Sequence, residues 1–293
     1  MLPEALPAVP AEPLPDLGGG LGRVALTGGL LAVLIGVLYR SVLPGWLSDL
    51  WVDPNYSHGL LVPFVSAWLV YQRRTELAAL IPQPSLGAIT IVAAAIVLMA
   101  AGLSAAEFFV TRVSLLVLLA GVVAFVLGWA YLRLLALPLA FLLFMVPLPT
   151  LVFNAIAIPL QLLASQLAII GLECIGVPAL RDGNVIVLPN TSLEVVEACG
   201  GIRSLISLGA TSLLFAVVSL RRPVSQLVLV ASSIAIAVSM NGARVAGTGV
   251  LAYHYGPGMA EGFFHEFSGW VVFVAALGCL AGEAALLRRL EGP

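Results

Sequence analysis

The chain has 293 residues, of which 61% are apolar and 10% charged, whereas a soluble domain usually carries about 25% charged residues. This composition excludes a soluble globule and predicts an all-α polytopic membrane protein in contact with the lipid bilayer. The formal net charge is −2, so no basic face exists to neutralise phosphates and a nucleic-acid partner is excluded.

Residues 1–22 are rich in Pro, Gly and Leu and lack the basic start of a signal peptide, so we expect a disordered tail. Residues 23–290 are expected to form a single transmembrane domain. A span needs about 20 mostly apolar residues. Eight stretches are predicted as spans, the second and fifth being short: Val24–Tyr39, Gly59–Gln72, Leu86–Ser104, Val110–Gly128, Leu134–Pro149, Ile202–Leu220, Val224–Asn241 and Phe267–Leu287.

The positions of arginine predict how these spans are oriented, because cytoplasmic flanks are enriched in basic residues. With the N-terminus in the cytoplasm, eight of the thirteen arginines fall inside. These eight include all three Arg pairs, at positions 73–74, 221–222 and 288–289. The sequence therefore predicts that both termini are cytoplasmic.

The stretch between Thr150 and Ala198 is predicted to lie on the outer face. Its first half, Leu151–Gly176, is apolar but contains Pro159 and two Gln residues, which favours an interfacial or re-entrant helix. If this half spans instead, the later topology inverts, which the Arg pairs oppose. The second half, Val177–Val196, has two short β-rich runs around a turn and predicts a hairpin above the membrane.

Four reactive or charged side chains that are far apart in the sequence fall at this same outer boundary. They are Cys199, Arg203, Arg244 and His265. Polar groups at membrane depth are costly and usually functional. Their convergence predicts a site at the outer end of the helices.

Cys199 lies in the run Glu197–Arg203, close to the predicted start of the sixth span. The partial positive charge of a helix N-terminus favours a thiolate, and the two glycines after Cys199 let a substrate backbone approach. Cys199 and Arg203 are spaced to share a helix face. Two alternatives stay open, namely an inert buried Cys199 and a disulfide between Cys199 and Cys174.

Three further residues complete the candidate site. Arg244 follows Asn241 by three positions and has a planar fork of donors that suits a carboxylate or an oxyanion, although an interfacial Arg can also bind lipid phosphate. His265 titrates in the range that a general acid and base needs, the alternative being a structural interfacial residue. His58, in the run Asp53–Gly59, either supports the site or has a structural role.

The run Glu197–Arg203, then Asn241–Arg244, then His265 with Gly269 resembles the exosortase/archaeosortase transmembrane family. The segments Tyr56–Gly59 and Gly176–Gly183 resemble its bacterial exosortase branch. The similarity extends from about Trp51 to about Phe273. One departure is that Gly200 stands where the family commonly has Ser after the Cys.

The resemblance implies a cysteine protease or transpeptidase of the bacterial inner membrane, with its active site facing the periplasm. Its substrates would be secreted proteins with a C-terminal Pro-Glu-Pro motif, a transmembrane helix and a basic tail, and the acyl acceptor is unknown. Cys199 would be the nucleophile, Arg244 the oxyanion stabiliser and His265 the acid and base. The supporting residues would be Glu197, Arg203, Asn241 and His58. No metal or cofactor is expected.

Two functions of other classes compete with this one. A transporter for a small solute or polysaccharide precursor would spread polar residues through the bilayer depth. A non-enzymatic scaffold for exopolysaccharide export would not need the Cys199 thiol. The clustering of the polar residues at one boundary favours the enzyme.

Overall fold

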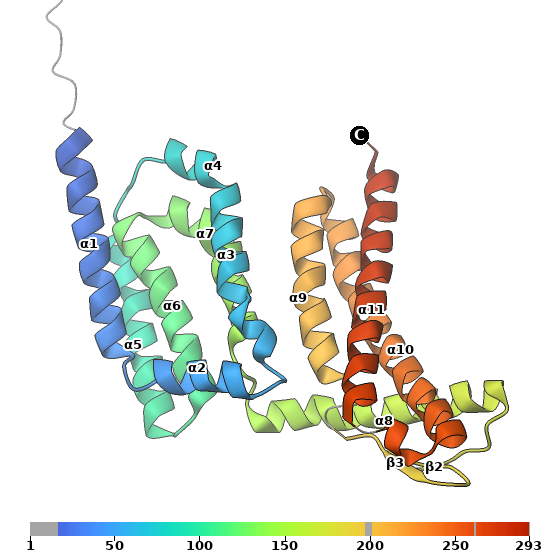
Figure 1. Cartoon of the computed structure of the whole chain (residues 1–293). Coiled ribbons are helices and arrows are strands. Elements are labelled where there is room, and N and C mark those ends of the chain that lie inside the picture. The colour runs from blue at the N-terminus through green and yellow to red at the C-terminus, as the bar shows by residue number, and fades with distance from the viewer. Residues whose placement is uncertain (1–16, 197–200, 261, 293) are drawn as a thin grey trace, which may run out of the picture. The chain divides into compact units, whose positions relative to one another are not determined.

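The computed structural model describes residues 17–196, 201–260 and 262–292, with side chains for 28–196, 201–258 and 267–292 (Figure 1). The chain divides into two compact units, 1–47 and 48–293. The first contains α1 (Leu17–Leu38) and the start of α2 (Leu43–Val52), and the second contains all later elements. The expected limits of a tail at 1–22 and one domain at 23–290 stay a prediction.

The first half of the second unit is a group of apolar helices joined by short loops. Its elements are η1 (Ser57–Leu60), α3 (Val62–Gln72), α4 (Arg74–Ala79), η2 (Leu86–Ala88), α5 (Ile89–Ser104), α6 (Phe108–Val126), α7 (Trp129–Phe141) and η3 (Leu142–Met145). Glycines allow α5 and α6 to approach closely, since a Cβ at Gly121 would lie 2.9 Å from a Val92 methyl carbon. In α7, Pro138 deprives the Leu134 carbonyl of its helical donor, and Arg73 donates to that carbonyl at 2.7 Å.

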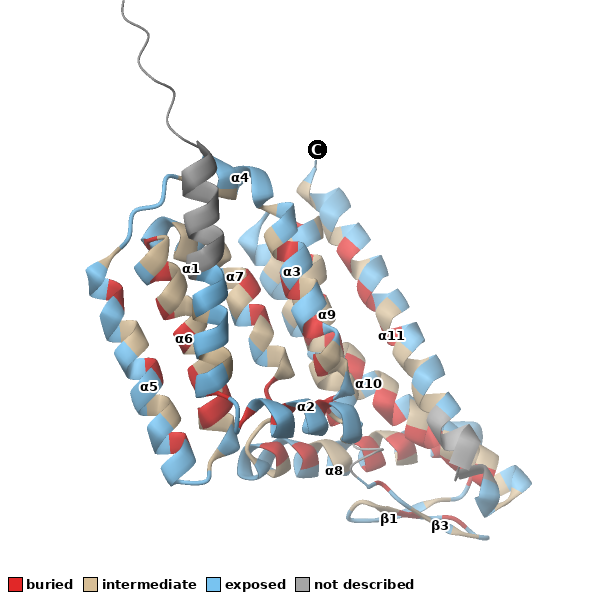
Figure 2. Cartoon of the chain, turned by 60° about the vertical axis from the view of Figure 1, so that its left-hand side comes forward, coloured by how far each residue is buried: buried red, intermediate tan, exposed pale blue. Residues whose placement is uncertain are grey.

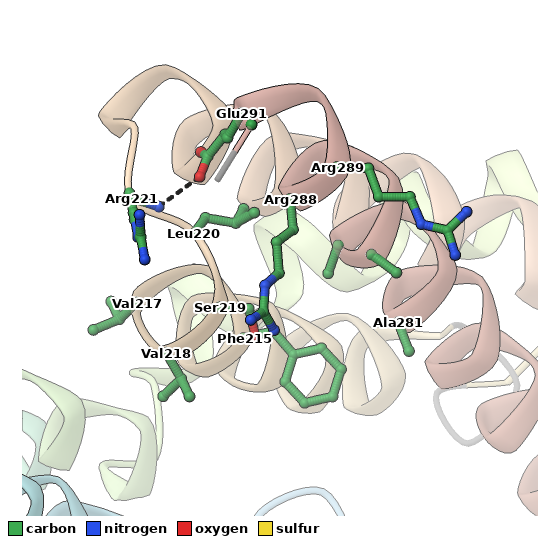
Figure 3. A pocket seen from close by; sticks show the side chains of 13 residues that line it. Phe215, Val217, Val218, Ser219, Leu220, Arg221, Ala281, Arg288, Arg289 and Glu291 are labelled. Carbon is green, nitrogen blue, oxygen red and sulfur yellow. Dashed lines mark hydrogen bonds between the residues drawn. The ribbon is translucent and has the colours of Figure 1, made fainter.

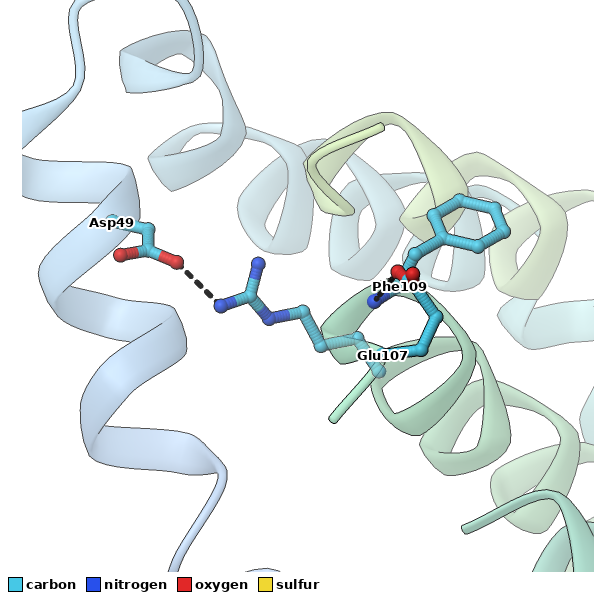
Figure 4. Close-up of polar contacts among 4 residues, drawn as sticks. Asp49, Glu107 and Phe109 are labelled. Atoms are coloured by element: carbon cyan, nitrogen blue, oxygen red, sulfur yellow. Dashed lines mark hydrogen bonds and ion pairs between the residues drawn. The ribbon is translucent and has the colours of Figure 1, made fainter. Parts of the chain in front are cut away.

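An ion pair joins α2 to α6 within the second unit. Arg112, in the second turn of α6, is 5% exposed and pairs with Asp49 of α2 (Figure 4). A charge buried in an apolar helix is costly unless it is paired, so this contact anchors α2 to the start of α6.

The second half of the unit contains the candidate site. Its elements are α8 (Thr150–Ile175), β1 (Leu180–Asp182), β2 (Val185–Val187), β3 (Ser192–Glu194), α9 (Ile202–Ser219), α10 (Pro223–Tyr255), η5 (Pro257–Ala260) and α11 (Gly262–Glu291). Both views show α8 running crosswise to α9, α10 and α11, at the end where the strands lie (Figures 1 and 2). This placement agrees with the expected interfacial helix, although α8 is long and apolar enough to cross a membrane.

The predicted hairpin is confirmed as β2 and β3, which pair antiparallel with Ile186 opposite Leu193. The structure adds a third strand, because β1 pairs with β2 through Arg181, which lies before the two runs predicted as a hairpin. The sheet order is β1-β2-β3. Ile186 is fully buried in a core shared with Leu172 of α8 and Val245 of α10, so the sheet is fixed to both helices.

Small residues bring α8 and α10 into close contact. A Cβ at Gly242 would lie 2.6 Å from the Cβ of Leu167, and one at Gly249 would lie 3.1 Å from a Leu172 methyl carbon. Close backbone approach at small residues is the usual way in which helices associate in a membrane, where the hydrophobic effect gives no net drive. This packing fixes the middle of α10 against α8.

The expected number of about eight spans is slightly too high. Among the described residues, six helices are long and apolar enough to cross a membrane, or seven if the bent pair Gly28–Leu38 and Leu43–Val52 is one span. The second and fifth predicted spans fail on length. α3 has 11 residues, about 16 Å, against a hydrocarbon core of about 30 Å, and Trp129–Met145 is also short. The all-α polytopic membrane class is confirmed.

The ends of these helices separate the arginines into two groups. The pairs at 73–74, 221–222 and 288–289 lie where α3, α9 and α11 end, and Figure 1 shows these ends together, opposite α8 and the strands. Many large apolar side chains along the helices are exposed, including Phe64, Leu86 and Val224, as expected for surfaces that face lipid (Figure 2).

Candidate functional site

The start of α9 packs directly against α10. Gly201 caps α9 with φ +81°, and a Cβ there would lie 2.8 Å from the Cγ of Asn241. Both the backbone angle and the lack of space require glycine at this position. Asn241 is 4% exposed, so its amide is buried beside the end of the run Glu197–Arg203.

One turn further along α10, Arg244 lies against α11. A Cβ at Gly269 would lie 3.1 Å from both Cζ and Nη2 of Arg244, so the guanidinium lies over a surface without a side chain. The Nε of Arg244 donates to Ser268 Oγ at 3.4 Å. Position 265 precedes Gly269 by four residues on α11 and therefore shares its helix face.

These contacts bring three helices together at one depth. Asn241 and Arg244 lie about 27–32 Å along α10 from its start at Pro223, close to the thickness of one hydrocarbon core. Gly201 lies about 27 Å from the far end of α9, and Gly269 lies about 33 Å from the far end of α11. The site is therefore at one boundary of the apolar layer.

His58 lies in η1, outside the long apolar helices, and is half-buried. Its Nε2 is 3.2 Å from the carbonyl oxygen of Phe144. Burial lowers the pKa of His58, the nearby positive charge of Arg203 lowers it further, and the carbonyls of Phe144 and Asn55 oppose the shift. Burial and the nearby Arg203 therefore favour the neutral form of the His58 imidazole.

Two hollows adjoin His58, and both are lined by Tyr56 and Leu148. One is polar, about 230 Å³, and also includes Asp53, Asn55 and Asn154. The other is about 370 Å³ and almost wholly apolar, with a lining of Tyr56, Ala140, Leu143, Phe144, Val146, Leu148, Leu205, Ile206 and Gly209. The polar and the apolar hollow thus share Tyr56 and Leu148 as lining residues, and the apolar one lies between η3 and α9.

The predicted site residues are only partly covered by the structure. Glu197 and Cys199 lie outside the described residues, as does the side chain of His265. The structure brings Asn241 against Gly201, and Arg244 against Gly269, and puts Arg203 in range of His58. α9 begins at Ile202 and has Arg203 in its first turn. The predicted shared helix face of Cys199 and Arg203 stays a prediction, because Cys199 lies outside the described residues.

The sequence interpretation missed Ser268 and the apolar lining of the second hollow. Ser268 accepts a hydrogen bond from Arg244. In the sequence, the one feature that pointed to Ser268 was its hydroxyl group next to Gly269, in the segment that also contains His265. Leu205 and Ile206 could not be recognised as cavity residues from the sequence, because apolar residues in a membrane span normally face lipid or the protein core.

The alternative disulfide of Cys174 is not supported. Cys174, near the end of α8, is a free and exposed cysteine. Cys279, in α11, is also free and exposed. Both residues are therefore suitable controls for substitutions at Cys199.

Comparison with known proteins gives a family for this site. The sequence model of the transmembrane exosortase family (Exosortase_EpsH) matches residues 46–282, which include every element of the candidate site. No curated protein and no solved structure matches the chain. Since the matched region covers most of the chain, the protein belongs to the transmembrane exosortase family.

Proposed function

We propose that this membrane exosortase is a cysteine protease or transpeptidase that removes the C-terminal sorting signal of secreted proteins. The signal comprises a Pro-Glu-Pro motif, a transmembrane helix and a basic tail, and the site faces the periplasm from the bacterial inner membrane. One observation carries the proposal. Gly201 and Gly269, the near neighbours of Cys199 and His265, both pack against residues one turn apart on α10.

The chemistry begins with transfer of the Cys199 thiol proton to His265. The thiolate attacks the scissile carbonyl and forms a tetrahedral oxyanion, which the Arg244 guanidinium stabilises. One such donor is worth about 3–4 kcal/mol in the transition state. As the C–N bond breaks, His265 returns the proton to the leaving amine, and a thioester remains on Cys199. Water or an amine acceptor then attacks the thioester and restores the thiol.

The surroundings of Arg244 support the role of oxyanion stabiliser. Gly269 and Ser268 fix the guanidinium from one side, so its orientation is set before the substrate binds. α9 and α11 both begin at this end of the bundle, and their N-termini add positive potential where negative charge develops. Asn241 fixes the chain at Gly201, two residues after the nucleophile.

His58 and Arg203 act on the substrate in this proposal. The neutral imidazole of His58 hydrogen-bonds the peptide, and Arg203, which is exposed, attracts the glutamate of the sorting motif. The polar hollow beside Tyr56 takes the extended motif, and the apolar hollow takes the first side chains of the substrate helix. Glu197 is assigned a supporting role in orienting His265.

The test is mass spectrometry of a co-expressed substrate with and without the enzyme. The wild type should give a substrate with a new, shorter C-terminus. Cys199→Ala should leave the C-terminal helix uncut, although the variant still inserts into the membrane. Cys279→Ala makes the same chemical change on α11 and should process normally. Normal processing by Cys199→Ala would refute the nucleophile.

One observation favours the competing transporter. Within the spans, Ser232 of α10 donates to Glu283 of α11 at 2.6 Å, and Ser212 of α9 contacts Ser233 of α10 at 3.2 Å. A carboxyl group at this depth is a usual mark of a solute or proton pathway. Glu283→Gln distinguishes the two functions, because a transporter should lose activity whereas the exosortase should process its substrate normally.

A further inference from the structure

A third cavity lies at the end of α9 and α11 opposite the candidate site (Figure 3). It has a volume of about 770 Å³, within the range of ordinary ligand pockets. The lining is mixed, and its apolar part comes from Phe215 and Val218 of α9 and from Ala281 and Ala285 of α11. Three arginines stand around it, namely Arg221, Arg288 and Arg289.

The one acidic residue in this lining, Glu291, is hydrogen-bonded to the backbone of the α9–α10 loop. Glu291 accepts hydrogen bonds from the backbone N–H groups of Arg221 at 2.8 Å and Arg222 at 3.0 Å. Arg222 also donates through Nη2 to the Glu291 carbonyl at 3.3 Å. These contacts fasten the loop to the end of α11 and fix the backbone that carries Arg221.

The guanidinium groups of the three lining arginines differ from Glu291 in their hydrogen bonding. In the part of the chain that the structure describes, no hydrogen bond or salt bridge is formed by the guanidinium of Arg221, Arg288 or Arg289. Figure 3 shows the Arg288 side chain reaching toward Phe215, so a charged head lies directly above an apolar wall. A ligand here meets several planar donors at one end and hydrocarbon at the other.

We propose that this cavity binds an anionic phospholipid. The phosphate of the head group bridges Arg221 and Arg288, and one acyl chain lies along Phe215, Val218 and Ala281. Phosphate matches the donor fork of arginine, and the excess of arginine over acid favours a head group with net negative charge. The position fits, because the site lies about one hydrocarbon thickness from Gly201 along α9.

Ordinary flanking arginines do not explain this arrangement. An Arg pair at a helix end is common and needs no cavity. Here two arginines from different segments line one cavity, namely Arg221 of the α9–α10 loop and Arg288 of α11. The side chain of Val218 in the same lining is 54% exposed and is therefore accessible to an acyl chain. A lipid bound there would link α9 to α11, the two helices whose other ends form the candidate site. This inference does not depend on the proposed peptidase activity.

The experiment uses the full chain, purified in a neutral detergent and mixed with one lipid at a time. Bound lipid is counted by native mass spectrometry, and the midpoint of thermal unfolding is measured in parallel. Phosphatidylglycerol should give a single retained lipid and raise the midpoint by several degrees, because a ligand of the folded state stabilises it. Phosphatidylcholine and inorganic phosphate should do neither.

Two double variants test the proposal, because each removes two arginine charges at the same end of the helices, one inside the cavity and one outside it. Arg221→Gln with Arg288→Gln should weaken phosphatidylglycerol binding at least ten-fold. Arg74→Gln with Arg133→Gln removes the same charge outside the cavity and should bind like the wild type. Equal binding by both double variants would overturn the proposal. Stabilisation by inorganic phosphate alone would also overturn it, in favour of a free anion site.

A third variant keeps every arginine and therefore guards against misfolding of the charge variant. Ala281→Phe fills the apolar wall where the acyl chain is placed, on an exposed position of α11. This variant should also lose the retained lipid while its unfolding midpoint without lipid stays near that of the wild type. Full retention of phosphatidylglycerol by Ala281→Phe would contradict an acyl-chain site.

Discussion

The Arg244 guanidinium is positioned in part by the absence of a side chain at Gly269 of α11. The guanidinium lies flat over Gly269, where any side chain would displace it, and Ser268 accepts a hydrogen bond from its Nε. These two contacts fix the orientation of the planar guanidinium on the side of α11. Gly269 is therefore a positioning residue in the proposed reaction.

Gly269→Ala tests this positioning. The new Cβ would lie 3.1 Å from Cζ and Nη2 of Arg244, so the guanidinium must shift. We expect the rate of substrate processing to fall by about 10- to 100-fold, as small misplacements of catalytic groups do. Gly278→Ala is the control on the same helix, because nothing lies within 4 Å of a Cβ there. Equal rates for the two variants would remove Gly269 from the site.

His58 predicts a pH dependence of stability. Its pKa is lowered in the folded protein from an ordinary value of 6.5, so the unfolded chain binds more protons just below that pH. The contribution of His58 is therefore complete above about pH 6.5 and is lost as the pH falls through the window beneath it.

Thermal unfolding in detergent at pH 7.5 and 5.5 measures this effect. The wild type should lose stability on acidification, and His58→Gln should lose less, because its amide does not titrate. His254→Gln changes an exposed histidine at the end of α10 and should behave like the wild type. An identical acid response of His58→Gln and the wild type would show that another group is responsible.

At the scale of elements, the hydropathy of the sequence predicted the apolar cores of α5, α6, α9 and α11, because each is a long and predominantly apolar run. It ended the seventh span at Asn241, whereas α10 continues to Tyr255. The polar residues in that extension do not break the helix, since Asn241 and Arg244 face partners on α9 and α11. Such partners come from tertiary packing and have no local signal.

The strand β1 shows the same limit. Leu180–Asp182 is short and two of its three residues are charged, so its composition does not favour a strand. It becomes a strand because β2 pairs with it and because Arg181 donates to the Leu162 carbonyl of α8 at 3.1 Å. The neighbouring hairpin was predictable because its β-branched residues flank a Pro-Asn turn.

The contact of α8 with α10 makes a prediction for stability. Gly242→Ala puts a Cβ 2.6 Å from that of Leu167, and overpacking of this kind costs about 1–3 kcal/mol. Gly247→Ala, on the same helix, meets nothing within 4 Å and should be neutral or stabilising by up to about 1 kcal/mol. Unfolding of both variants in a denaturing detergent gives the comparison, and equal stability would contradict the observed packing.

At the scale of the whole second unit, the two ends of α9, α10 and α11 have different chemistry. One end gathers Gly201, Asn241, Arg244 and Gly269, and the other carries the arginine-lined cavity. The distribution of arginine predicted this separation into two ends, because it depends only on helix length and alternation. The pairwise contacts within each end could not be predicted, since they depend on how the helices pack.

Convergence at the first end is the central claim, and cross-linking tests it most directly. In a chain carrying Cys174→Ala and Cys279→Ala, His265→Cys is oxidised beside the native Cys199, and linked peptides are identified by mass spectrometry. Gly278→Cys serves as the control, about 20 Å further along α11 from position 265. We expect a disulfide between Cys199 and position 265 and none with position 278. Absence of the first link, or equal yield of both, would contradict a common site.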